Sequence, residues 1–160
     1  MSAVGLLALT ALSAVTTGLA APAVPAVPAV LDAKPSVIVE LLRSEGCRPG
    51  FRAGDEKTAP SITVKVGGHT FFLSFTGCRD GLCGRISTSN GFERPEQAEG
   101  LAASLSGWNA RWSSQAYEAQ DGPGSLDASY VLTGGFTGAN FLAWLGAYRN
   151  EDDEFTHILS

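Results

Sequence analysis

One stretch decides the fold of this chain: FFLSFTGCRDGLCGRISTS, residues 71–89. Phe71, Leu73 and Phe75 stand two residues apart, so they share one face of a strand, because successive side chains of a strand point to opposite faces. A turn-forming insert between two cysteines follows, and residues 84–92 return as a partner strand. The stretch therefore predicts two antiparallel strands joined at a cysteine-bracketed turn.

Cys78 and Cys83 are positioned to form a disulfide in an exported protein, because opposed residues of antiparallel strands bring their Cβ atoms into bridging range. For so short a loop, the loop-entropy model gives about 2 kcal/mol of stabilisation. A zinc site would need two further ligands, and His69 is the only nearby candidate. A redox pair is more often Cys-x-x-Cys at a helix N-terminus. We therefore predict a structural disulfide, with no metal or cofactor.

Cys47 is left unpaired by this assignment. It follows the first predicted helix, and three alternatives fit it: a buried small hydrophobe, an exposed thiol, or one half of an intermolecular bridge. We favour the buried alternative, because a free cysteine is among the most often buried residue types.

The N-terminal segment is typical of a secretory signal peptide. Residues 1–31 carry no charged side chain, and residues 4–19 form a nearly continuous apolar run. The small residues Ala20 and Ala21 offer a cleavage site, so we predict a signal peptide over residues 1–21. An uncleaved membrane anchor is the alternative. No Lys or Arg precedes the apolar run, which indicates an upstream start codon or an atypical leader.

Proline recurs at every third position from Pro22 to Pro28 and favours extended polyproline geometry. We predict a stiff linker over residues 22–33, the alternative being a ligand for a proline-recognising groove. These prolines also disfavour a membrane span, which would need about 20 apolar residues. One domain remains, residues 34–160, and we expect the protein in the periplasm or outside the cell.

The charge of the chain argues against nucleic acid as a partner. Its formal net charge is −5, and its eleven basic residues are scattered along the sequence. A duplex-binding surface needs clustered Lys and Arg to displace counterions from the phosphates.

The remaining patterns alternate between helix and strand periods. Ser36 can cap a first helix that ends at Gly46, and Thr137 can cap a last helix. The run Glu151–Glu154 lacks the spaced ligands of a calcium loop and is typical of a solvated helix end. Between the two helices we predict strands over 62–66, 69–76 and 84–92, a helix from Pro95 to Asn109, and strands over 112–118 and 126–132. The fold class is α+β, a twisted antiparallel sheet of about five strands with three packing helices in the order αβββ(β)αββα.

Several of these residues together resemble the YbjN domain family. The resemblance covers roughly residues 34–155, and it rests on the strand before Cys78, the pair Trp108-Asn109, and Gly134-Gly135 before an aromatic helix. The family is described as putative bacterial sensory transduction regulators, with a fold similar to type III secretion chaperones. The sequence departs from the family pattern at Cys47, where exported relatives tend to carry an aromatic residue.

The resemblance implies a binding module for a protein or peptide partner, without an established enzymatic activity or cofactor. Chaperone-like relatives often pair into dimers, so it also implies a homodimer as an alternative to a monomer. The positions that match the family motif are expected to be structural: Phe75, Gly77, Trp108, Asn109, Trp112, Tyr117, Gly134, Gly135 and Trp144.

The three tryptophans, Trp108, Trp112 and Trp144, could form an exposed platform for a peptide or glycan, or anchor helices on the sheet. Their helical spacing favours the core. Asn109 follows Trp108 directly, where it can cap the helix or satisfy a buried backbone group.

No catalytic residues are predicted. His69 and His157 are the only imidazoles and stand alone in the sequence, and no Gly-x-Ser-x-Gly elbow occurs. The expected function is therefore an exported, non-enzymatic binding or regulatory module of the cell envelope. The alternatives are a small hydrolase-like envelope enzyme, which would gather titratable groups in one cleft, and a structural or stress-related factor with neither groove nor cleft.

Overall fold

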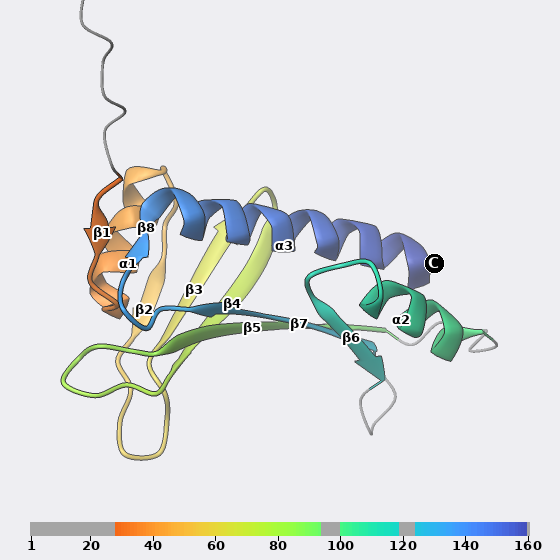
Figure 1. The fold of residues 1–160 in the computed structure, drawn as a ribbon, viewed down its shortest axis with the longest axis horizontal. Coiled ribbons are helices and arrows are strands. Elements are labelled where there is room, and N and C mark those ends of the chain that lie inside the picture. The colour runs from red at the N-terminus through yellow and green to blue at the C-terminus, as the bar shows by residue number, and fades with distance from the viewer. Residues whose placement is uncertain (1–27, 94–99, 119–123, 160) are drawn as a thin grey trace, which may run out of the picture.

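The computed structural model of the chain describes residues 28–93, 100–118 and 124–159 (Figure 1). The predicted signal peptide and the first half of the predicted linker, residues 22–27, lie outside these residues. The elements, in chain order, are β1 Val30–Leu31, α1 Pro35–Ser44, β2 Gly50–Arg52, β3 Ser61–Val66, β4 His69–Thr76, β5 Arg85–Phe92, α2 Leu101–Asn109, β6 Gln115–Glu118, β7 Gly124–Val131, β8 Phe136–Thr137 and α3 Gly138–Leu159.

The predicted α+β class is confirmed, with one difference in strand number. The main sheet has six antiparallel strands in the order β2-β3-β4-β5-β7-β6, where the sequence predicts about five. Strand β2 is the additional one, and with three residues it is too short to show the two-residue period of a strand. The two-residue strands β1 and β8 pair separately, so the end of the predicted linker contacts the domain.

Two hairpin turns use backbone conformations with positive φ. Gly67 and Gly68 join β3 to β4 with φ of 59° and 92°, and Asp80 and Gly81 lie at the tip of the cysteine loop with φ of 53° and 77°. Two-residue turns of this hand match the twist of the strands they connect. The Asp-Gly and Gly-Gly pairs therefore fix the register of both hairpins.

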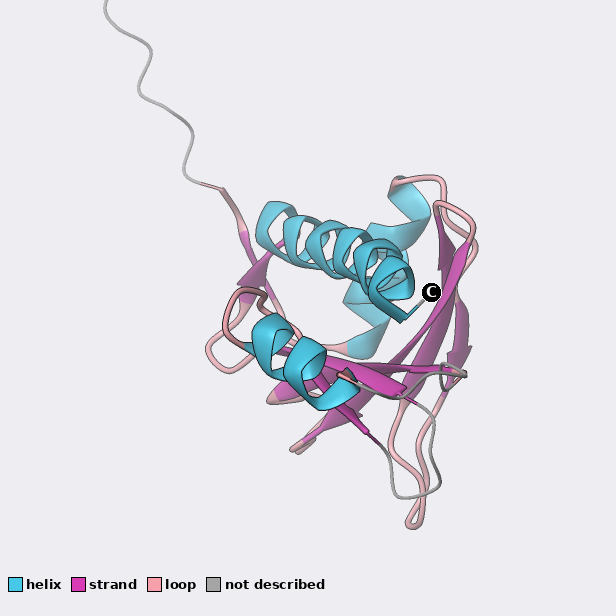
Figure 2. Ribbon diagram, turned by 90° about the vertical axis from the view of Figure 1, so that its right-hand side faces the viewer, coloured by secondary structure: helices cyan, strands magenta, loops and turns pink. Residues whose placement is uncertain are grey.

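Strands β4 and β5 separate along their length. Their register pairs only Ser74–Thr76 with Arg85–Ser87, which are the ends next to the cysteine loop. Beyond these pairs β4 rises steeply while β5 continues beside β7 (Figure 1). The sheet consequently curves around α3, as the view along that helix shows (Figure 2).

The core lies between the curved sheet and α3. Phe141, Leu145, Tyr148 and Phe155 of α3 are all buried. They pack with the inward side chains of the strands, which include Ile62, Phe71, Leu73, Phe75, Ile86 and Leu126. Fully burying one such side chain contributes about 1.5–3 kcal/mol, so this interface supplies most of the driving force for folding.

The last helix differs from the sequence expectation at its acidic run. Thr137 does cap it, because its Oγ1 accepts the Asn140 N–H at 3.2 Å. The helix then continues through residues 151–154 to Leu159, and Glu151 and Asp152 are only 5% and 4% exposed. The expectation of a solvated helix end is therefore wrong for these two carboxylates, because polar groups of the sheet and of the loop before β6 compensate their burial.

Candidate functional site

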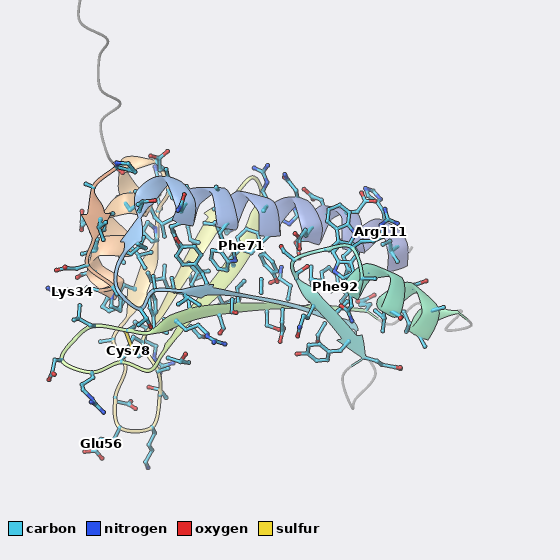
Figure 3. The ribbon with its side chains drawn as sticks, viewed as in Figure 1. Lys34, Glu56, Phe71, Cys78, Phe92 and Arg111 are labelled. Atoms are coloured by element: carbon cyan, nitrogen blue, oxygen red, sulfur yellow. A yellow bond between two sulfur atoms is a disulfide. The ribbon has the colours of Figure 1, made fainter. Side chains whose placement is uncertain are left out.

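Three loops meet at the end of the molecule that holds the disulfide. Cys83 donates its backbone N–H to the Ala33 carbonyl at 2.8 Å, and Leu132 donates to the Gly84 carbonyl at 2.8 Å. Figure 3 shows Cys78 at the same end as Lys34, opposite the end that carries Arg111. We call this region, residues 28–34, 77–84 and 132–135, the disulfide end.

The disulfide end contains the predicted Cys78–Cys83 disulfide. Within its loop, Arg79 and Leu82 exchange two backbone hydrogen bonds of 2.8 and 3.0 Å around the Asp-Gly turn. Cys83 is buried, whereas Cys78 and the rest of the loop tip are exposed. The disulfide therefore holds a small, rigid hairpin at the surface.

The family-motif glycines are grouped at the disulfide end. Gly77, Gly134 and Gly135 have φ of 64°, 87° and 93°, which other residues rarely adopt. At Gly135 space is also limiting, since an added Cβ would lie 2.5 Å from Cγ1 of Val30 and 3.0 Å from the Leu31 carbonyl oxygen. This glycine allows the N-terminal strand to approach.

Two shallow recesses flank the disulfide. The edge recess, of about 370 Å³, is lined mainly by Pro35, Phe51, Ala53, Pro60, Cys78 and Cys83. The loop recess, of about 520 Å³, is lined mainly by Val30, Leu31, Leu82, Leu132, Gly134 and Gly135. Phe51, Leu82 and Val30 are 47%, 45% and 68% exposed, so both recesses present apolar side chains to solvent.

The two edges of the main sheet differ. At the β6 edge, Asn109 donates its side-chain amide to the Ala116 carbonyl at 2.8 Å and accepts the Ala116 N–H at 2.7 Å. This side chain occupies the position that an added strand would need. Strand β2, at the other edge, is exposed and has β3 as its one strand neighbour in the described part of the chain.

Two exposed arginines lie at the β2 edge. Arg48 and Arg52 flank Phe51 in sequence and are both exposed. Among the described residues, neither guanidinium has a carboxylate within ion-pair distance. The edge thus offers two arginines around one exposed phenylalanine.

A polar cluster spans the separated ends of β4 and β5. Asp152 of α3 contacts His69 Nδ1 through one carboxylate oxygen at 2.9 Å and accepts the Asn90 amide through the other at 2.7 Å. The second ring nitrogen of His69 lies 2.9 Å from Asp153. The cluster joins a helix to two strands where the strands are not paired.

Glu151 fastens the loop before β6 to α3. Its carboxylate accepts the Ser113 hydroxyl at 2.6 Å and the Ser114 N–H at 2.8 Å. The Ser114 hydroxyl in turn accepts the Trp108 indole N–H at 3.2 Å. Burial by itself would raise the pKa of Glu151, but the hydrogen bonds from the two serines outweigh it, so the pKa lies below its ordinary value of 4.5.

The predicted aromatic positions have separate roles. Phe75 and Trp108 are fully buried, and Trp112 stacks on Trp108 at 5.1 Å while remaining 38% exposed. Trp144 is half-buried and contacts Tyr130 and Phe141 rather than the other tryptophans. Trp108 is thus a core anchor, and in the structure the three indoles do not share one platform.

Tyr117 is exposed and donates its hydroxyl to Asp127 at 2.9 Å. This hydrogen bond, together with burial, raises the pKa of Tyr117. Burial likewise raises the pKa of Tyr148, whose hydroxyl donates to the Leu126 carbonyl at 2.7 Å. Cys47 is half-buried and packs against the core as a free thiol.

Sequence reasoning missed the role of Asp152. One signal could have revealed it, because Tyr148, Asp152 and Phe155 recur at helical spacing and therefore share a face. Within the described residues, no group of three or more His, Cys, Asp or Glu side chains is arranged to hold a metal ion. No helix in that part of the chain is both long and apolar enough to span a membrane.

We expect Asp152→Ala to lower the free energy of unfolding by about 2–3 kcal/mol, because it leaves His69 and Asn90 without their buried carboxylate. Asp153→Ala is the matched control, since that side chain is 55% exposed, and it should change stability by less than about 1 kcal/mol. Urea unfolding at neutral pH measures both. Equal losses in the two variants would contradict a bridging role for Asp152.

The lowered pKa of Glu151 predicts a pH dependence of stability. The ionised carboxylate is stabilised in the folded state, so its contribution is present above the ordinary pKa of 4.5 and is lost as the pH falls through the lower folded value. Glu151→Gln should be less stable at neutral pH and should lose less further stability on acidification. Thermal melts recorded at neutral pH and at a series of acidic pH values check this. Glu154→Gln is the control, because Glu154 is exposed.

The comparisons with known proteins identify the family of the chain. No curated protein matches this chain. The family model YbjN, described as "Putative bacterial sensory transduction regulator", matches residues 34–157, which include all three helices except the last two residues of α3. The match covers most of the chain, and the chain therefore belongs to the YbjN family.

Proposed function

We propose that this protein is an exported, non-enzymatic regulatory module that binds an extended peptide segment of a partner protein along strand β2. The family assignment supports a regulatory module, since the family is that of putative sensory transduction regulators. The difference between the two edges of the sheet supports the choice of β2 as the binding surface.

The observation that carries the proposal is the difference between the two sheet edges. At the β6 edge, the Asn109 side chain is hydrogen-bonded to the backbone N–H and C=O of Ala116. At the other edge, β2 is exposed beside the edge recess. An exposed edge presents unpaired backbone N–H and C=O groups, to which an extended peptide can add as a further strand. One edge is therefore suited to accept a peptide and the other is protected.

The edge recess accounts for side-chain selection. Phe51 lies on β2 and also lines the recess, so a strand added beside β2 would run along its apolar wall. Because alternate side chains of a strand point to the same face, every second residue of such a peptide faces the recess. This arrangement selects apolar residues at alternate positions.

The arginines add a charge preference. Arg52 lies on β2 and Arg48 lies two residues before the start of this strand, and opposite charges on adjacent strands stabilise their pairing. The preferred segment is thus apolar at alternate positions and acidic at its ends. Electrostatic attraction of this kind raises association rates more than affinity and weakens with added salt.

An enzymatic function is less well supported by the same surfaces. The titratable cluster of His69 and Asp152 connects α3 to two strands and lines neither recess. Lys34 is the titratable side chain at the edge recess, and its ammonium already pairs with Asp32 at 3.0 Å. The geometry therefore favours binding over acid-base chemistry.

Export is supported by the disulfide and by the composition of the leader. Disulfides form and persist in oxidising compartments such as the periplasm. We expect the protein isolated from its own host without reductant to have the mass of a chain lacking the leader, less two hydrogens. Intact-mass spectrometry checks this, and a full-length, fully reduced chain would contradict export.

The peptide proposal can be tested with peptides selected from a random library on the oxidised protein. The best binders should alternate apolar residues and carry acidic ends, and Phe51→Lys should weaken them at least about tenfold, or about 1.4 kcal/mol. Ile158→Lys is the matched control, because Ile158 is also 40% exposed but lies near the end of α3. Fluorescence polarisation measures the affinities.

Two results would count against the β2 edge. One is equal binding to the Phe51→Lys and Ile158→Lys variants, and the other is a set of peptide-induced amide shifts in the NMR spectrum that leaves β2 and β3 unaffected.

A further inference from the structure

The outer face of the sheet carries a row of serines. Ser61, Ser74, Ser87 and Ser129 lie directly opposite one another on β3, β4, β5 and β7. Their chain neighbours Ile62, Leu73 and Ile86 are fully buried on the helix side, so the hydroxyls face away from α3. In Figure 1 this face is the lower side of β5 and β7, opposite α3.

An open groove of about 510 Å³ runs over three of these serines, Ser74, Ser87 and Ser129. We call it the serine groove, and its lining includes Phe72, Ser74, Arg85, Ser87, Asp127 and Ser129. Its volume falls within the range of about 300–1,000 Å³ that is usual for small-ligand sites. The groove lies over the face of the sheet, where side chains rather than backbone groups are presented, so a ligand would bind through side chains.

Asp127 supplies an acceptor without a donor. One oxygen of its carboxylate accepts the Tyr117 hydroxyl at 2.9 Å. The other, Oδ1, is enclosed and has no hydrogen-bond partner among the described residues. Buried polar atoms are nearly always hydrogen-bonded in folded proteins, so the Asp127 carboxylate keeps unused acceptor capacity beside the groove, which a rotation of its side chain would turn toward a ligand O–H or N–H group.

The charge of the groove is balanced. The guanidinium of Arg85 is exposed, has no ion pair among the described residues, and can donate to ligand oxygens. Asp127 provides one opposite charge within the same lining. The groove therefore favours a neutral ligand, since an anion would meet Asp127 and a cation would meet Arg85.

Phe72 adds an apolar surface to these polar groups. It is 57% exposed and lies on β4, two residues before Ser74. The face of an aromatic ring is electron-rich and attracts positively polarised groups. The C–H groups on the flat face of a pyranose ring are of this kind, while the hydroxyls at its rim can both donate and accept.

We propose that the serine groove binds a neutral oligosaccharide whose pyranose rings carry equatorial hydroxyls. Such rings are flat, so one face can stack on Phe72 while rim hydroxyls donate to Asp127 and exchange hydrogen bonds with the serines and Arg85. The site is separate from the β2 edge, and it stands whether or not that edge binds a peptide. It gives an exported regulator direct contact with envelope or environmental glycans.

The test uses the full-length oxidised protein, with cellotetraose as the probe and ¹⁵N-resolved amide shifts as the readout. Cellotetraose at about 10 mM, which suits dissociation constants in the millimolar range, should shift the amides of Ser74, Ser87 and Ser129. Phe72→Ala and Asp127→Asn should each weaken binding at least about fivefold. Thr63→Ala is the matched control, because Thr63 is exposed beside Phe72 but does not line the groove, and it should bind like the parent protein.

Three outcomes would overturn the proposal. The first is the absence of groove shifts with cellotetraose. The second is an equal loss of binding in Phe72→Ala and Thr63→Ala. The third is a concentration-dependent dimer that Phe72→Ala dissociates and cellotetraose does not affect, which would assign this face to a second copy of the chain. Phe72 is exposed, so its substitution leaves the core intact even if Asp127→Asn perturbs folding.

Discussion

The curvature of the sheet depends on one buried carboxylate, because the backbone ladder between β4 and β5 is short. These strands share only three residue pairs, and beyond them the sheet opens. Asp152 of α3 closes the opening through His69 on one strand and Asn90 on the other. The Asp152 side chain thus connects two strands that lack cross-strand hydrogen bonds at this position. Because Asp152 belongs to α3, the separation of the strands depends on where this helix lies. A buried acid can fill this role because each of its oxygens has a partner.

The sequence was most informative where structure is local. The two-residue period of Phe71, Leu73 and Phe75 and the cysteine-bracketed turn predict β4, β5 and the disulfide, since each signal lies within a few residues of the contact it reports. The acidic run led to the wrong prediction of a solvated helix end, because the partners of Asp152 are more than sixty residues distant in sequence. A charge run considered alone is usually solvated, and only the three-dimensional arrangement supplies the groups that offset burial.

The candidate surfaces could be predicted even less from the sequence. Strand β2 is too short for a periodic pattern, and its importance comes from its place at the edge and from the block at the opposite edge by Asn109. The serine groove likewise needs the register of four strands, because its serines are distant in sequence and align only when the strands pair. Both surfaces are products of topology: the first lies at an edge of the sheet, and the second lies on the sheet face that is turned away from α3.

The pairing of β1 with β8 bears on the order in which the molecule can assemble. Val30 lies opposite Thr137, so a residue near the start of the domain pairs with one that follows roughly a hundred residues later in the sequence. Contacts of such long sequence separation form slowly, because a large loop must close first. In a chain that is synthesised from its N-terminus, this strand would dock late, and it would close the fold against Gly135 once the rest of the domain had formed. Until then the apolar side chains of the disulfide end would be exposed to solvent and to other molecules.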